Sequence, residues 1–93
     1  MNIKEAVKIA IEHARDVFEH EKISNLGLEE VEFNESQNEW RITVGFSRPW
    51  DETKGALGPL LLGQGMSANR SFKILTINDR TGRIKSIKNY QIK

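Results

Sequence analysis

The chain has 93 residues, of which 38% are hydrophobic and 29% charged, the composition of one small globular domain. Its 14 basic and 13 acidic side chains give a net charge of +1, so the total charge selects neither nucleic acid nor a membrane surface. The lack of cysteine excludes a disulfide framework, a thiolate nucleophile and thiolate-bound zinc or iron–sulfur sites. Because there are only two histidines, we also expect no histidine-rich metal cluster. We expect no cofactor.

The near-neutral total is a cancellation between two halves of the chain. Residues 1–47 carry ten acidic and five basic side chains, a net charge of −5, whereas residues 48–93 carry nine basic and three acidic ones, a net charge of +6. Two explanations stay open. Acidic and basic strands can pair across a sheet, each pair contributing about 0.2–1 kcal/mol, or the separation can mark a polar surface for a partner.

The first predicted element is a helix over residues 2–22. Asn2 and Glu5 have the spacing of a capping box, in which each side chain bonds the backbone N–H of the other. The run Ser-Asn-Leu-Gly at 24–27 predicts its end. Apolar side chains recur every three to four residues, which predicts one buried face: Val7, Ala10, Ala14, Val17 and Phe18.

Two histidines on this helix raise the question of a metal site. His13 and His20 lie seven residues apart with Asp16 between them, which could supply three ligands. A zinc site needs a further ligand or water and an oriented outer shell, and the sequence shows neither. We therefore expect two histidines exposed on the solvent side of the helix and no metal.

Beyond the helix the hydrophobic pattern repeats every two residues, which predicts strands. The third strand has apolar residues of both parities and is expected to be central in the sheet or covered on both faces, whereas the fourth is expected to contain a bulge or to be two-sided. A short hairpin loop is expected at 36–38, and a type I turn with Gly82 at positive φ between the last two strands. The strands are expected at about 28–35, 39–47, 70–78 and 83–92.

These elements predict an α+β fold in a single domain over residues 1–93. One N-terminal helix packs across a four-stranded antiparallel sheet, in the order α-β-β-β-β. A single helix covers one face of a sheet. The other face must be wet, covered by the long loop, or paired with another chain.

The long connection at 48–69 is the most informative segment, since about twenty-two residues without secondary structure exceed the usual loop length. It holds four glycines, both prolines and many apolar side chains. Three interpretations stay open: a lid over the uncovered sheet face, a partner-binding loop, or disorder. An exposed Trp beside an Arg is typical of an interface hot spot. The predicted partner contacts are Arg48, Pro49, Trp50, Leu60, Leu61 and Leu62.

Patterns that would indicate an enzyme are missing. Residues 63–68, Gly-Gln-Gly-Met-Ser-Ala, lack the third glycine of a dinucleotide fingerprint and the Gly-Lys-Ser/Thr ending of a P-loop. Neither histidine belongs to a recognisable triad motif, and the glutamates at 29–35 stand in a charged strand where nothing predicts a raised pKa. We expect no catalytic activity.

A basic stripe on the last hairpin is the basis of an alternative function. Aromatic side chains stand near it, and basic groups with aromatics can bind single-stranded nucleic acid. The sequence pI is about 8.1, below the value above 9 that is typical of such domains. Nucleic acid is therefore kept as the alternative partner, through Arg80, Arg83, Lys85 and Lys88.

The sequence shows no targeting segment. Charged residues interrupt the first turn, and the apolar runs are far shorter than the roughly 20 residues that span a bilayer. We expect a cytoplasmic protein with no membrane partner.

The last hairpin, Phe72–Ile84, resembles the closing hairpin of PepSY-like domains, in which an extended strand ends in an Asp/Asn turn followed by Thr-Gly. The helix around 5–10 and the strand around 40–44 fit the same helix-then-sheet plan. The fold also looks similar to the cystatins, which insert a hairpin loop containing Pro-Trp into proteases, and Pro49-Trp50 matches that dipeptide. Both resemblances imply a small α+β domain, and they imply inhibition of a peptidase.

Together these observations predict a non-catalytic protein-binding module, of an inhibitor or immunity type, that acts through residues 48–69 and the open sheet face. The alternatives are a homodimerising structural domain or a weak nucleic-acid binder. The identity of the partner lies beyond the sequence.

Overall fold

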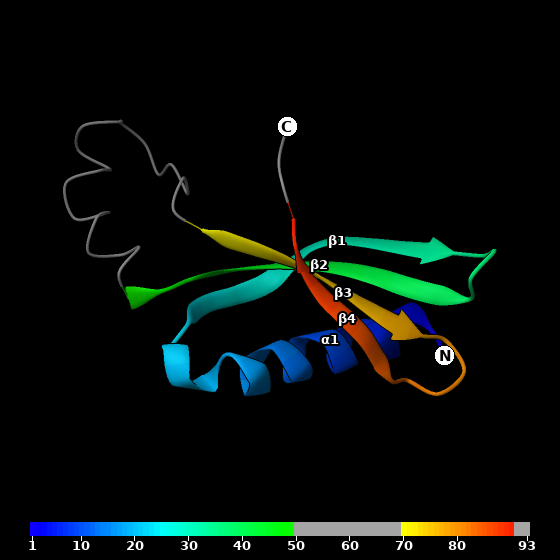
Figure 1. The fold of residues 1–93 in the computed structure, drawn as a ribbon, viewed down its shortest axis with the longest axis horizontal. Helices are drawn as coiled ribbons and strands as arrows, with labels where there is room; N and C mark the ends of the chain where they lie inside the picture. Colours follow the sequence, from blue (N-terminus) through cyan, green and yellow to red (C-terminus); the bar gives the residue numbers. More distant parts are fainter. Residues whose placement is uncertain (50–69, 91–93) are drawn as a thin grey trace.

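The computed structural model describes residues 1–49 and 70–90, in which one helix lies against one face of a four-stranded antiparallel sheet (Figure 1). The sheet order is β1-β2-β3-β4, so β2 and β3 are internal and β1 and β4 are the edges. The predicted α+β class and the order α-β-β-β-β are confirmed. The elements are α1 (Ile3–Val17), the 3-10 turn η1 (Glu19–Glu21), β1 (Ser24–Asn34), β2 (Glu39–Ser47), β3 (Ser71–Asn78) and β4 (Ile84–Asn89).

The predicted capping box starts α1. The Glu5 backbone N–H donates to Asn2 Oδ1, and the Asn2 N–H donates to Glu5 Oε1, both at 2.9 Å. Small side chains on the buried face have no exposed surface, and they allow the helix backbone to approach the sheet closely. They are Ala6, Ala10 and Ala14.

The predicted helix end at residue 22 is wrong. The helix ends at Val17, and Phe18 is its C-cap. After η1, Lys22 adopts φ 51° in the left-handed region, and the chain enters β1 at Ser24. The run at 24–27 is therefore the start of a strand and not a helix stop.

The core lies between α1 and the two internal strands. Its fully buried side chains alternate along each strand, because successive side chains point to opposite faces. Phe46 also contacts Phe18 at the end of the helix, with ring centroids 5.0 Å apart. The core side chains of the sheet are Ile42, Val44, Phe46, Leu75 and Ile77.

The turns are close to those predicted. The β1–β2 hairpin turns at residues 35–38, with Asn38 at φ 52°. In the β3–β4 turn, Asn78 Oδ1 accepts the backbone N–H of Arg80 and of Thr81, and Gly82 has φ 75°. A register shift in the β3–β4 pairing confirms the predicted bulge in the last strand, which ends at Asn89 rather than at 92.

The sheet face away from α1 is polar, and it joins the acidic half of the chain to the basic half. Glu39 is 6% exposed there and is held by Lys85 from β4. This observation supports pairing as the explanation of the charge asymmetry. Among the described residues, the side-chain ion pairs between the halves are Lys85–Glu39 at 2.6 Å, Arg48–Glu21 at 2.5 Å and Arg70–Glu29 at 3.4 Å, and the amino group of Met1 also pairs with Asp79 at 3.3 Å.

Candidate functional site

An open groove of about 960 Å³ runs between α1 and β4. It exists because α1 packs mainly against β1 and β2 and leaves the β4 side of the apolar face uncovered. Ile9 of the helix and Ile84 of the strand are only partly buried and line the groove. The groove therefore offers apolar surface that no described element covers.

The walls of the groove differ in charge. The helix wall carries Glu12, Asp16 and Glu19, together with Arg15, and the strand wall carries Arg83 and Lys85. Within residues 1–49 and 70–90, none of the three carboxylates on the helix wall has an ion-pair partner. This wall presents a negative surface to a ligand.

The start of β4, Ile84–Ser86, lines the same groove, and the outer edge of the strand continues beyond it to Asn89. The Tyr90 backbone N–H donates to the Phe72 carbonyl at 3.1 Å, so this opposed pair is hydrogen-bonded. Hydrogen-bonded and non-bonded pairs alternate in an antiparallel ladder. The backbone groups of Ile87 and Asn89, opposite Leu75 and Lys73, therefore point away from β3. No strand among the described residues pairs with this edge.

The side chains of these two outward-pointing residues lie on the helix side of the sheet. Ile87 packs against the hydrophobic core. Asn89 accepts a hydrogen bond from Lys73 Nζ, and that ammonium lies 5.7 Å from the centre of the Phe18 ring. A strand added beside β4 would thus project alternate side chains onto the helix side of the sheet, where the groove also lies.

The basic residues suggested for nucleic acid do not form one surface. Lys85 is bonded to Glu39, while Arg83 lines the groove. Arg80 stands exposed in the β3–β4 turn. Lys88 is opposite Ile74 on the polar face, near the edge-to-face pair of Phe72 and Tyr90.

Arg48, a predicted partner contact, is engaged within the molecule. Its Nε bonds Glu21 Oε1 at 2.5 Å, its Nη1 bonds Ser71 Oγ at 2.6 Å, and its guanidinium lies 5.2 Å from the centre of the Phe46 ring. Pro49 follows it and is exposed. The other predicted contacts, Trp50 and Leu60–Leu62, lie outside the described residues. Partner binding by this set stays a prediction.

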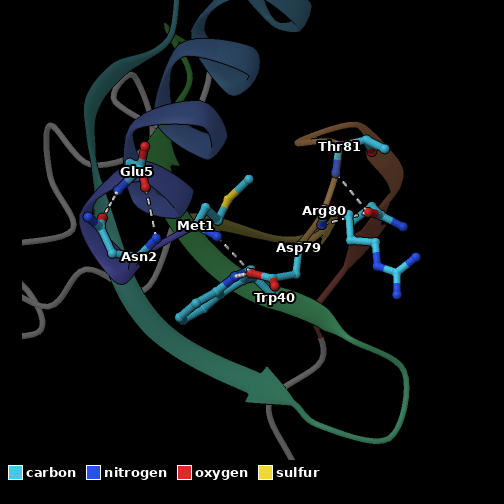
Figure 2. Close-up of polar contacts among 8 residues, drawn as sticks. Met1, Asn2, Glu5, Trp40, Asp79, Arg80 and Thr81 are labelled. Carbon is cyan, nitrogen blue, oxygen red and sulfur yellow. Dashed lines mark hydrogen bonds and ion pairs between the residues drawn. The ribbon is translucent and has the colours of Figure 1, made fainter.

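A second polar cluster lies at the N-terminal end of α1 (Figure 2). Asp79 Oδ1 accepts the Trp40 indole N–H at 2.8 Å and lies 3.3 Å from the amino group of Met1. The hydrogen bond from Trp40, and then the hydrogen bond and charge of the amino group, lower the pKa of Asp79, although burial opposes them. The cluster ties the start of α1 to β2 and to the β3–β4 turn.

Only one of the two histidines is exposed, although both were expected to be. His20 is exposed in η1, but His13 is half-buried and lines the groove. Among the described residues, no group of three or more His, Asp or Glu side chains is placed to hold a metal ion. In the same part of the chain, no helix is long and apolar enough to cross a membrane.

Comparison with known proteins identified no relative of this chain. No family model matches the chain, and no curated protein or solved structure matches it at a significant level. The resemblance to PepSY-like domains and cystatins stays a prediction.

Proposed function

We propose that this protein is a non-catalytic protein-binding module that takes an extended segment of a partner along the outer edge of β4. The observation that carries the proposal is the coincidence of an unpaired strand edge with an open, partly apolar groove. A peptide that adds to a sheet edge gains main-chain hydrogen bonds, and its alternate side chains fill the adjoining pocket.

The geometry of β4 suits such an addition. The N–H and C=O groups of Ile87 and Asn89 point outward, and their side chains lie on the groove side. Edge strands are commonly protected by lysines and bulges. Here Lys85, the residue in the bulge, lines the start of the groove, and its ammonium group is held by Glu39.

The loop proposed from the sequence remains part of this function. Arg48 and Pro49 lie at the end of β2, at the beginning of the segment that contains Trp50 and Leu60–Leu62. We propose that this segment and the polar sheet face supply further contacts to the same partner, as in an inhibitor or immunity-type protein. The basic residues, divided between two surfaces, support nucleic-acid binding less well.

A matched pair of variants tests the β4 edge. Asn89→Pro removes one outward N–H, whereas Asn89→Ala removes the same side chain and keeps the N–H. Proline is tolerated at a strand edge whose N–H faces solvent. The probe is a displayed library of random decapeptides, selected on the native protein.

We expect the selected peptides to bind Asn89→Ala and native protein alike, and to bind Asn89→Pro about two- to tenfold more weakly, as the loss of one such hydrogen bond implies. Hydrogen exchange should slow at the amides of Ile87 and Asn89 when peptide is bound. The proposal is overturned if the selection yields no binder, if both variants bind equally, or if protection appears only elsewhere.

A further inference from the structure

The two edge strands of the sheet carry side chains of opposite charge at corresponding positions. On the polar face, Glu30 and Glu32 of β1 are exposed at one edge, and Lys88 of β4 is exposed at the other. We infer that the strand added to β4 is β1 of a second copy of this chain, so that the copies associate head to tail. This inference rests on the proposed function of the β4 edge.

The register of the sheet places these charges in one row. Glu30 is opposite Thr43, Thr43 is opposite Ile74, and Ile74 is opposite Lys88. If a second sheet continues the first in this register, Glu30 of the incoming copy faces Lys88 directly. Opposite charges at facing positions stabilise an antiparallel pair, whereas like charges destabilise it.

The backbone of β1 has the phase that this pairing needs. The Asp79 N–H donates to the Asn38 carbonyl across the β2–β3 pair. Because bonded and non-bonded pairs alternate, the backbone N–H and C=O groups of the even-numbered residues of β2 point toward β3, and those of the odd-numbered residues point toward β1. Val31 is opposite the even-numbered Ile42, so its own backbone groups point away from β2. Val31 lies in the same row as Ile87, whose backbone also points outward. The two can therefore exchange hydrogen bonds.

The helix side of the two edges is complementary as well. Leu28 and Phe33 of β1 are 46% and 37% exposed, and they would extend over the partly covered apolar surface beside β4. A smaller hollow of about 410 Å³ on the β1 side of α1 is bordered by Lys4 and Lys8, whereas the helix wall of the groove on the β4 side carries three carboxylates and one arginine, Arg15. The facing helix surfaces thus carry opposite charge.

A head-to-tail contact uses two different surfaces, so it is distinguished from a symmetric dimer by blocking one edge at a time. Asn89→Pro blocks β4, and Val31→Pro blocks β1 by removing its outward N–H. Asn89→Ala and Val31→Ala are the controls that keep each N–H. Molar mass is measured by sedimentation velocity over a range of concentrations, after circular dichroism confirms folding.

We expect the mass of the native protein to rise with concentration and each proline variant alone to remain monomeric. An equimolar mixture of the two proline variants should form a species of twice the monomer mass, since each still has one intact edge. A monomeric native protein at all concentrations would overturn the inference. Dimers of one proline variant alone would also overturn it, because they require a symmetric contact.

Charge exchange gives a second test with exposed residues that leave the core untouched. Glu30→Lys and Lys88→Glu should each weaken association up to about fivefold, and the double variant should restore it. Failure of the double variant to recover contradicts the register. If random peptides bind native protein but not Asn89→Pro, while native protein stays monomeric, the function proposed for β4 stands and only the second copy as its partner is excluded.

Discussion

Asp79 gathers two donors from distant parts of the chain, the indole of Trp40 and the amino group of Met1. Its pKa is lowered below the ordinary value of 3.8, first by the hydrogen bond from Trp40 and then by the amino group. A carboxyl group whose pKa is lower in the folded state stabilises the fold at pH values above its unfolded pKa, and this contribution is lost as pH falls through the folded pKa.

Asp79→Asn tests this pH dependence, because the amide keeps an acceptor for Trp40 but cannot ionise. We expect native protein to be more stable than the variant at pH 7, and the difference in unfolding free energy to shrink as pH falls below about 4. Urea unfolding between pH 3 and pH 7, followed by tryptophan fluorescence, measures it. An equal difference at both ends of this range would contradict the assignment.

At the scale of elements, the sequence predicts those features whose causes are local. The capping box at Asn2 and the turn at Gly82 follow from residues within a few positions of each other. The end of α1 was missed because it depends on distant packing: Phe18 caps the helix and packs on Phe46 of β2. The groove was missed for the same reason, since it depends on which strands the helix covers.

The close approach of α1 to the sheet depends on its small buried side chains. Ala10→Leu adds volume where the native residue has no exposed surface, and we expect a loss of about 1–3 kcal/mol in unfolding free energy. Lys4→Leu, at an exposed position of the same helix, is the control and should change stability by less than about 0.5 kcal/mol. Equal effects in urea unfolding would show that the helix does not depend on this contact.

At the scale of the whole molecule, the near-neutral charge arises from two opposite halves that meet on the polar face of the sheet. Glu39 is the most buried carboxylate at this junction, with Lys85 at 2.6 Å and Arg41 at 3.9 Å. Removing one member of such a pair leaves the other poorly compensated, whereas replacing both removes that penalty. The pair therefore tests whether the charge separation contributes to folding.

A double-mutant cycle with Lys85→Met and Glu39→Gln measures the coupling. Because Lys85 is half-exposed, solvent screens the pair, and we expect a coupling of about 0.5–1 kcal/mol in unfolding free energy, smaller at high salt. Lys85→Met should lower the unfolding free energy more in the native protein than in the Glu39→Gln variant. A coupling of zero would mean that this ion pair does not contribute to folding, and that the two halves are joined by the β2–β3 pairing, the apolar core and the other ion pairs.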